Sequence, residues 1–295
     1  MRWAEGFIAV DWGTTNRRAW RIGVDGAVAE EMEDGCGILS IPKGRFPGAV
    51  QQVRERLGEL PMLMAGMVGS NRGWIEAPYV PCPAGLPELA ARLQWAEPDR
   101  VAIVPGVSWE SGADADVMRG EEVQILGAFA KGWIAPEATI CHPGTHNKWI
   151  RLEDGRITAF RTVMTGELFN LLKGHSILAD LLQGEVAEGA AFEAGVHHGL
   201  EQDDLTAELF SVRARALLGK AERGDAASYV SGLLIGSDIK VGLRTAGEGE
   251  IVVMARPDLA RLFSAALEVA GRSSRAIDGE AAFLAGIRHL AELVQ

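Results

Sequence analysis

Cysteine is scarce in this chain of 295 residues, and long apolar runs are absent. The three cysteines, Cys36, Cys82 and Cys141, form an odd set without a Cys-x-x-Cys spacing, which argues against a disulfide framework and a zinc site and suits a reducing cytosol. No uninterrupted apolar run approaches the ~20 residues that cross a bilayer. Residues 1–6 also lack the apolar core of a signal peptide. We therefore expect a cytoplasmic protein without a membrane partner.

Positive charge is also in short supply. The chain has 29 Lys and Arg residues against 40 Asp and Glu residues, a formal net charge of -11. This balance argues against nucleic acid or an anionic membrane surface as the main partner, although a local basic site can still bind a small anion. With 47% hydrophobic and 23% charged residues, the composition is that of a globular protein long enough for two hydrophobic cores.

Several familiar catalytic motifs are missing. The chain has no GxxxxGK[ST] segment, no GxGxxG after its first strand, no GxSxG elbow and no HExxH. The adjacent pair His197 and His198 has no partner at a metal-ligand spacing, so we interpret it as part of a helix surface. These absences argue against P-loop, dinucleotide-binding, α/β-hydrolase and zincin chemistry.

What the chain does contain is one short segment twice. Residues 8–18 (IAVDWGTTNRR) and residues 139–149 (TICHPGTHNKW) lie 131 positions apart. In one register, Gly13 matches Gly144, Thr14 matches Thr145, Asn16 matches Asn147, and Arg17 matches the basic Lys148. Each copy follows a short apolar run and precedes a second run that enters an Asp-Gly turn. The pattern predicts strand, Gly-Thr turn, strand, in both places.

A Gly-Thr turn between two strands can direct backbone N–H groups and a hydroxyl at a phosphate, because glycine lets the backbone approach closely. Two such turns facing each other would bind a polyphosphate from both sides. The duplication therefore predicts two related lobes with a nucleotide between them. The alternative is two unrelated β-hairpins, since Gly-Thr is a common dipeptide.

The remaining pattern predicts a strand-rich first lobe and a helix-rich second lobe. Expected strands are 7–10, 19–22, 28–32, 61–65, 101–105 and 250–254, and expected helices are 46–57, 121–131, 167–182, 187–200, 206–218, 226–241, 257–270 and 281–293. Residues 77–87, with four prolines, read as extended or irregular. Residues 66–74 (GMVGSNRGW) form an exposed loop at a strand end, where α/β folds bind ligands.

Carboxylates stand next to the first turn and before the second. Asp11 ends the first strand and could hold Mg²⁺, which prefers one or two carboxylates plus substrate phosphates; the alternative is a residue that caps a turn. Glu121 and Glu122 open an apparent helix, where one could take the proton of an attacking hydroxyl. Acids in a first helical turn are common without any catalytic role.

Cations and aromatic residues surround both turns. Arg17, Arg18, His146 and Lys148 could neutralise phosphates or a substrate carboxylate, or could belong to a solvated strand face. Three tryptophans beside the glycine turns could wall a sugar site or pack between the lobes: Trp12, Trp74 and Trp149.

Together these motifs resemble a known family. The paired turns are similar to the phosphate motifs of the actin-like ATPase superfamily, which includes sugar kinases, hexokinases and Hsp70-type chaperones. More narrowly, the chain resembles the 2-dehydro-3-deoxygalactonokinase family. The motifs that carry this resemblance, in order, are 11–20 (DWGTTNRRAW), 65–74 (AGMVGSNRGW), 117–122 (VMRGEE), 143–149 (PGTHNKW), 160–169 (FRTVMTGELF), 231–236 (SGLLIG) and 278–288 (DGEAAFLAGIR).

The resemblance implies an α/β fold of two actin-like lobes, a ribonuclease H-like duplication with the active site in the interlobe cleft. The expected lobes are 1–135, with the first phosphate turn and the sugar-acid loops, and 136–295, with the second phosphate turn and the adenosine site. Whether the last helix returns toward the N-terminal lobe stays open. The implied reaction is ATP- and Mg²⁺-dependent phosphorylation of the 6-hydroxyl of 2-dehydro-3-deoxy-D-galactonate.

The resemblance also implies roles for single residues. Related sugar kinases carry a Gly-Asp-Gln segment whose Asp is the base, and Gly120-Glu121-Glu122 looks like its counterpart, which favours Glu121 over Glu122 and Asp116. The expected cofactor contacts are Asp11 (also the metal ligand), Gly13, Thr14, Thr15, Gly144, Thr145, Lys148, Gly232 and Arg256. The expected substrate contacts are Asn16, Arg18, Gly69, Ser70, Asn71, Arg119, Glu122 and His146. Arg256 stands where the adenosine turn of the superfamily usually has a glycine, and could stack on the nucleotide.

Other readings remain open at this point. The acid could be a related 2-keto-3-deoxy sugar acid such as the gluco epimer. A phosphatase of the exopolyphosphatase type shares the paired turns but would lack the substrate loop at 66–74. An actin-like filament or chaperone would usually carry inserted subdomains. The expected partners are a small sugar acid and ATP, and a homodimer is one open oligomeric state.

Overall fold

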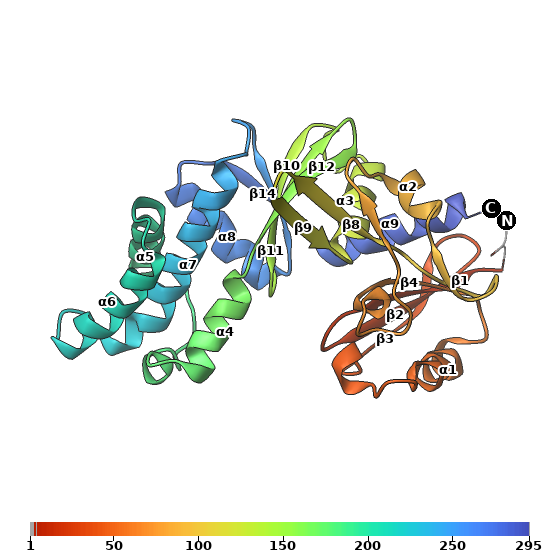
Figure 1. Cartoon of the computed structure of the whole chain (residues 1–295), viewed down its shortest axis with the longest axis horizontal. Helices are drawn as coiled ribbons and strands as arrows, with labels where there is room; N and C mark the ends of the chain where they lie inside the picture. Colours follow the sequence, from red (N-terminus) through yellow and green to blue (C-terminus); the bar gives the residue numbers. More distant parts are fainter. Residues whose placement is uncertain (1–2, 4, 295) are drawn as a thin grey trace. The chain divides into compact units, whose positions relative to one another are not determined.

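Two sheets with the same strand order organise the chain. The computed structural model describes residue 3 and residues 5–294 (Figure 1). One sheet has the order β3-β2-β1-β4-β7-β6 and another has the order β12-β11-β10-β13-β14. The strands of the first are β1 (Phe7–Trp12), β2 (Arg17–Ile22), β3 (Val28–Asp34), β4 (Met62–Gly66), β6 (Gln94–Glu97) and β7 (Val101–Ile103). Those of the second are β10 (Ala138–His142), β11 (Asn147–Glu153), β12 (Arg156–Val163), β13 (Ile251–Ala255) and β14 (Ser274–Asp278).

The strand directions agree as well. β1 pairs with β2 antiparallel and with β4 parallel, just as β10 pairs with β11 antiparallel and with β13 parallel. The next parallel pairs, β4–β7 and β13–β14, are also equivalent. Each Gly-Thr turn therefore connects the same two strands of its own sheet. The duplication predicted from the two sequence segments is confirmed in the topology.

The chain divides into two units. The first comprises Met1–Pro136, Glu153–Ala159 and Glu280–Gln295, and the second comprises Glu137–Leu152 and Phe160–Gly279. Helices of the first are α1 (Phe46–Leu57), α2 (Leu86–Ala90), α3 (Glu121–Ala130) and, from Glu280 onward, α9 (Gly279–Leu293). Helices of the second are α4 (Thr165–His175), α5 (Ala190–Glu201), α6 (Leu205–Leu217), α7 (Ala226–Leu243) and α8 (Pro257–Val269).

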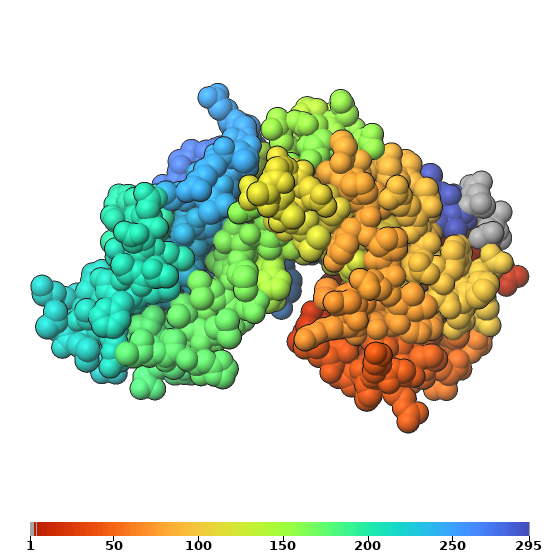
Figure 2. All heavy atoms as spheres, in the orientation of Figure 1, coloured from red at the N-terminus to blue at the C-terminus, as the bar shows by residue number. Residues whose placement is uncertain are grey.

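A small third sheet belongs to the first unit. It has the order β5-β8-β9, built from β5 (Tyr79–Pro81), β8 (Gly106–Ser111) and β9 (Asp114–Met118). The tip of the β8–β9 hairpin lies at the surface and is coloured yellow in Figure 2. The sequence did not predict this hairpin, because its residues lack the apolar alternation that marks a half-buried strand.

The core of the first unit follows from its strands. Residues 7–10 of β1 and 62–66 of β4 are buried throughout, as expected for central strands covered on both faces. Helix α1 has Pro47 in its first turn and packs Phe46, Val50 and Val53 into the same core. In the second unit, α7 is buried along most of its length and packs on α5.

One predicted helix is shorter than expected. Residues 167–182 were expected as a single helix, but α4 ends at His175, and a 3-10 turn follows at Ala179–Leu181. The Ser176 hydroxyl donates to the Leu172 carbonyl and accepts from the Leu178 N–H, so this side chain ends the helix. Among the described residues, no helix has both the length and the hydropathy needed to cross a bilayer.

Helices α3 and α9 meet through glycines (Figure 1). A Cβ on Gly127 would lie 2.2 Å from the Ala282 carbonyl oxygen and 2.3 Å from the Gly286 nitrogen. A Cβ on Gly286 would lie 2.1 Å from the Val123 carbonyl oxygen. The two backbones therefore touch, and any side chain at either position would force the helices apart.

We expect Gly286→Ala to lower the melting temperature by several degrees. Overpacking of this kind costs about 1–3 kcal/mol, and each kcal/mol corresponds to roughly 2–4 °C in a protein of this size. Gly48→Ala in α1 is the matched control, since a Cβ there meets nothing within 4 Å. Thermal unfolding of both variants checks the contact, and equal melting temperatures would contradict it.

Candidate functional site

Asp11 and Arg18 face each other across the first two strands. They are register partners on β1 and β2, and Arg18 Nη2 donates to Asp11 Oδ2 over 2.7 Å. Burial raises the pKa of Asp11, Arg18 opposes that rise, and the charge of nearby Glu121 adds to it. A half-buried acid near the end of β1 thus lies within electrostatic reach of both a cation and a second acid.

The first Gly-Thr turn presents exposed groups on a supported backbone. Thr14, Thr15 and Asn16 are exposed, and the Gly13 N–H donates to the Asn16 carbonyl over 2.9 Å. Gly37 supports the turn: its N–H donates to the Thr15 carbonyl over 3.0 Å, and a Cβ on it would lie 2.4 Å from the Thr14 oxygen. No local sequence pattern pointed to Gly37, which precedes a 3-10 turn.

Arg17 and Trp12 belong to the core rather than to the surface of the turn. Arg17 is 1% exposed, donates to Asp34 over 2.6 Å and to the Ala49 carbonyl over 2.9 Å, and lies over the Trp12 ring. Trp12 is fully buried and donates to the Cys36 carbonyl. We therefore drop Arg17 as a phosphate-neutralising cation and Trp12 as a wall of a sugar site.

Two glycines lie beside Asp11. A Cβ on Gly66, which ends β4 with φ +90°, would lie 2.8 Å from the Trp12 carbonyl oxygen and 3.4 Å from Asp11 Oδ1. A Cβ on Gly120, with φ +112°, would lie 3.3 Å from the Gly66 Cα. The positive φ and the close approach both require glycine. Gly120 in turn directs α3, so its first residue, Glu121, starts next to this glycine pair.

The two acids of α3 differ sharply in their surroundings. Glu121 is half-buried, and its carboxylate accepts the Arg119 N–H over 3.1 Å. Glu122 is fully buried, and both of its oxygens accept the Gly120 N–H, over 2.9 and 2.7 Å. Burial, helped by the charge of Glu121, raises the pKa of Glu122 to about 8. The Glu122 carboxyl group is thus enclosed and fixes Gly120, and the expected substrate contact by Glu122 stays a prediction.

The residues expected at the sugar-acid loop are only partly exposed. Asn71 is exposed, whereas Gly69 and Ser70 are buried and the Ser70 hydroxyl donates to the Met67 carbonyl. Arg119 lies behind this loop, 9% exposed, with its guanidinium 4.4 Å from the Tyr79 ring centroid and Nη2 donating to the Ala77 carbonyl. Arg119 Nη1 lies 3.0 Å from the position that a Cβ on Gly69 would occupy, so the Arg119 guanidinium packs directly against the loop.

Asp116, the third acid considered from the sequence, lies on β9. It is half-buried, and its Oδ1 accepts the Val117 N–H over 2.8 Å. Glu121, in contrast, is coupled electrostatically to Asp11. The geometry of the first unit thus favours Glu121 as the acid that acts beside the first turn.

A buried carboxylate holds the second Gly-Thr turn. Asn147 Oδ1 accepts the Gly144 N–H over 2.8 Å, and Asn147 Nδ2 donates to Asp238 Oδ2 over 2.5 Å. Trp149 Nε1 donates to Asp238 Oδ1 over 2.6 Å, and the Thr165 hydroxyl hydrogen-bonds to Oδ2. Burial raises the pKa of Asp238 to about 6, against the effect of its three donors. The sequence analysis did not predict this role of Asp238. The signal that could have revealed it is an acid inside an otherwise apolar helix.

The start of α4 covers the same turn. The Glu167 N–H donates to the Thr145 carbonyl over 2.9 Å, and a Cβ on Gly166 would lie 2.4 Å from the Gly144 oxygen. Thr145 and His146 are exposed, and His146 pairs with Glu167. Lys148 is 4% exposed, and Trp149 is buried against Asp238, so Trp149 is a core residue and not a sugar wall.

Two further expected nucleotide contacts lie elsewhere in the second unit. Gly232 is in the middle of α7, where a Cβ would lie 2.1 Å from the Phe192 carbonyl oxygen of α5. Helix packing accounts for this glycine, and its expected nucleotide contact stays a prediction. Arg256 precedes α8 directly after β13, and its side chain is 76% exposed.

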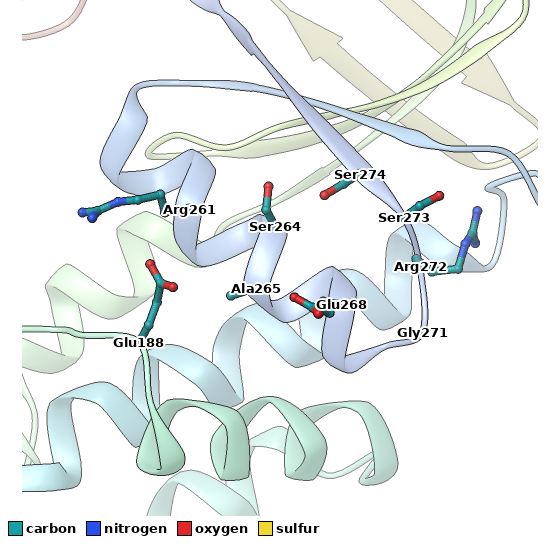
Figure 3. A pocket seen from close by; sticks show the side chains of 9 residues that line it. All are labelled: Glu188, Arg261, Ser264, Ala265, Glu268, Gly271, Arg272, Ser273 and Ser274. Atoms are coloured by element: carbon teal, nitrogen blue, oxygen red, sulfur yellow. The ribbon is translucent and has the colours of Figure 1, made fainter.

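A polar cavity of about 660 Å³ opens in the second unit, away from these residues (Figure 3). Arg261, Ser264, Ala265 and Glu268 of α8 line one side, and Ser273 and Ser274 line the other. None of the expected site residues contributes to it. Within the part of the chain that the structure describes, no three His, Cys, Asp or Glu side chains form a metal-binding group.

Comparisons with known proteins agree with the sequence motifs. A family model described as "2-keto-3-deoxy-galactonokinase" matches residues 11–290. The chain is 38% identical to the 2-dehydro-3-deoxygalactonokinase of Escherichia coli K12, over 98% of both chains. It is 37% identical to a solved putative 2-dehydro-3-deoxygalactonokinase from Sinorhizobium meliloti, with a TM-score of 0.89 over 97% of this chain and 96% of the other.

A more distant match concerns the fold alone. Component A of (R)-2-hydroxyglutaryl-CoA dehydratase from Acidaminococcus fermentans is 11% identical, with a TM-score of 0.52 over 98% of this chain and 99% of the other. Together with the two equivalent sheets, these matches confirm the α/β class and the duplicated actin-like ATPase fold that the sequence predicted.

Glu122→Gln should stabilise the protein increasingly as pH rises. Burial raises the pKa of Glu122 from 4.5 to about 8 in the folded state, so the folded state holds a proton that the unfolded state loses as pH rises. The wild type therefore loses stability between those two pH values, by up to about 1.4 kcal/mol for each pH unit. A glutamine keeps an oxygen for the Gly120 N–H and does not titrate.

Urea unfolding of both proteins at pH 5, 7 and 8.5 measures this difference. Glu193→Gln, at an exposed position on α5, is the control and should leave the pH dependence unchanged. Parallel stability curves for wild type and Glu122→Gln would show that the Glu122 carboxyl group is not held protonated.

Proposed function

Because the chain belongs to the 2-keto-3-deoxy-galactonokinase family, we propose that it transfers the terminal phosphoryl group of ATP to the 6-hydroxyl of 2-dehydro-3-deoxy-D-galactonate. The reaction belongs to D-galactonate catabolism, and we propose that it takes place in the cytoplasm. The single observation that carries the chemistry is the pair of acids at the first turn: a half-buried Glu121 whose charge acts on Asp11.

Glu121 is the proposed general base. Phosphoryl transfer to an alcohol needs a carboxylate that orients the hydroxyl and takes its proton. Glu122 is enclosed and bound to the Gly120 N–H, whereas Glu121 is half-exposed next to Gly120 and Asp11. Because Glu122 is protonated, it places no second negative charge beside Glu121. Glu121 is therefore the acid of this pair that we propose as the base.

The Gly-Thr turns are the proposed phosphate-binding elements. Gly13 and Gly144 let the backbone of each turn come close to phosphate oxygens, while Thr14, Thr15 and Thr145 offer backbone N–H groups and exposed hydroxyls. We propose Lys148 as a further phosphate contact and Arg256, exposed just after β13, as the side chain that stacks on the adenosine. Both turns are then needed for productive use of ATP.

Asp11 fits a magnesium ion. Arg18 binds its Oδ2, while Oδ1 lies beside Gly66, where no side chain intrudes. Magnesium bound to ATP usually takes one or two protein carboxylates, with phosphates and water completing the octahedron, so one acid suffices. When bound, the ion would neutralise charge on the phosphates. The side chain of Asp11 itself supplies a fixed negative group at the end of β1.

The sugar acid is proposed to bind on the first unit near the exposed Asn71 and Asn16, with Gly69 and Ser70 shaping the loop and Arg119 supporting it from behind. Arg18 and His146 are the proposed cations for its carboxylate or for the phosphates. A kinase for the gluco epimer or another 2-keto-3-deoxy sugar acid is the nearest alternative. A phosphatase or an ATPase switch of the same fold is disfavoured by the family assignment.

ATP turnover with and without sugar acid tests the proposal. A coupled assay should show ADP release that depends on 2-dehydro-3-deoxy-D-galactonate, and a panel with the gluco epimer and related acids ranks the substrates. Equal ATPase rates with and without every acid in the panel would overturn the kinase assignment for this chain.

Glu121→Gln should lower kcat by roughly 100-fold or more, the usual scale for losing a general base. KM for ATP should change little, because the carboxylate acts on the sugar hydroxyl. Steady-state kinetics measure both values, and Asp116→Asn is the comparison that the sequence suggests. A near-normal kcat in Glu121→Gln, with a large loss in Asp116→Asn, would move the base to β9.

A further inference from the structure

A residue that the sequence did not single out completes the charge arrangement at the first turn. Arg18 Nη1 donates to Glu280 Oε2 over 3.1 Å, while Nη2 donates to Asp11 over 2.7 Å. We propose that Glu280 is a positioning residue that holds the Arg18 guanidinium at Asp11, where Arg18 binds an oxyanion of a substrate. The inference rests on the proposed function, since it assumes that substrates bind at the first turn.

The three residues come from three different elements. Asp11 is the last residue but one of β1, Arg18 is its register partner on β2, and Glu280 lies in the first turn of α9, more than 250 positions farther along the chain. The Arg18 guanidinium is therefore fixed from two sides. One acid is local to the strand pair, and the other is delivered by the last helix.

An aromatic contact sets α9 in place for this interaction. Trp20 lies two residues after Arg18 on the same strand, so both side chains project from the same face. Phe283 lies three residues after Glu280, on the same side of the helix. The Trp20 and Phe283 rings lie 5.5 Å apart, and Arg18 lies over the Trp20 ring at 5.7 Å. The hydrophobic contact thus brings Glu280 to Arg18.

The ion pair itself contributes little to holding the helix. The Arg18 and Glu280 side chains are 29% and 43% exposed, and exposed pairs of this kind are worth about 0–1 kcal/mol. The contact of Phe283 with Trp20 and the glycine contact with α3 hold helix α9 in position. Loss of Glu280 should therefore change the orientation of Arg18 much more than the stability of the fold.

Loss of Glu280 would allow the Arg18 side chain to turn into a neighbouring cavity. A cavity of about 380 Å³ beside it is lined by Arg18, Trp20, Glu31, Glu33 and Glu280, among others. Glu33 is the register partner of Arg18 on β3, and its charge already acts on the guanidinium. The acids of β3 would draw Arg18 into this cavity, whereas Glu280 holds it at Asp11.

A guanidinium carries five N–H donors, and the bonds to Glu280 and Asp11 use two of them, which leaves others for a ligand. The ligand chemistry is an oxyanion, which is either a phosphate of ATP or the carboxylate of the sugar acid. KM for each substrate separates these two sources. A rise in KM for ATP assigns Arg18 to phosphate, and a rise in KM for the acid assigns it to the carboxylate.

The test compares Glu280→Gln and Glu280→Ala with wild type. We expect one of the two KM values to rise roughly 3- to 10-fold, more in the alanine variant, because a glutamine oxygen can still accept from Arg18. We expect kcat to change less than about twofold and the melting temperature by no more than about 2–3 °C. Glu33→Gln is the matched control: it removes the same charge near Arg18 but no hydrogen bond, and should leave both KM values unchanged.

A double-mutant cycle identifies the route of the effect. If Glu280 acts through Arg18, Glu280→Ala should add nothing to the KM of Arg18→Gln. Additive effects, or an equal effect of Glu33→Gln, would overturn the positioning role. So would unchanged KM values in both Glu280 variants, or a kcat loss that merely follows a large drop in melting temperature.

The rise in melting temperature that Mg-ATP produces is measured in wild type and in the Glu280 variants. If wild type phosphorylates no sugar acid but is stabilised by Mg-ATP, the proposed function fails. The role of Glu280 is then tested by the rise in melting temperature that Mg-ATP produces. A smaller rise in the Glu280 variants supports the inference, and an equal rise overturns it. If wild type is an active kinase and the variants match it in every readout, the inference fails and the proposed function stands.

Discussion

The hydrogen bonds of the buried Asp238 carboxylate hold the second Gly-Thr turn, one of the two turns that we propose bind phosphate. Asn147 links Asp238 to the Gly144 N–H, while Trp149 and Thr165 bind the same carboxylate from β11 and α4. Loss of the acid would leave three buried donors without a partner, each at a cost of about 1–3 kcal/mol. The first turn has no equivalent acid: its Gly13 N–H donates to the Asn16 backbone carbonyl, and Gly37 supports it. The two copies thus share the strand, Gly-Thr turn, strand arrangement but stabilise the turn with different hydrogen bonds.

Three acids of the first unit lie near the first turn. Glu122 is fully buried, whereas Asp11 and Glu121 are half-buried, and desolvation raises the pKa values of Asp11 and Glu122. Arg18 compensates the charge of Asp11, and protonation removes the charge of Glu122. Glu121 is the half-buried carboxylate that we propose takes the proton of the substrate hydroxyl. Glu280 extends the same arrangement by fixing the cation that compensates Asp11.

The sequence predicted the parts of the fold that depend on local signals. The helix expected at 46–57 is α1 with the same bounds, because apolar spacing and Pro47 define it locally. The duplication was readable because the matching residues lie together in one short segment of each copy. Asp238 and Glu280 were missed because their partners are distant: Asp238 binds Asn147 across 91 positions, and Glu280 binds Arg18 across 262. Gly232 lies in a helix contact that the sequence did not predict, since a glycine required for helix packing looks like one required by a ligand.

We propose that both Gly-Thr turns bind phosphate, and the ATP affinity of Gly13→Ala and Gly144→Ala tests this pairing. A Cβ on Gly144 would meet nothing closer than the His146 oxygen at 3.9 Å, whereas a Cβ on Gly13 would lie 3.3 Å from the Asn16 oxygen, a tight contact that requires a small shift. The melting temperature should therefore stay close to wild type in Gly144→Ala and fall slightly in Gly13→Ala. The added methyl group should displace phosphate from the turn and lose one charge-assisted hydrogen bond, which weakens ATP binding by roughly 10- to 100-fold in each variant. If calorimetry shows that either variant binds Mg-ATP as tightly as wild type, the two turns are not a functional pair.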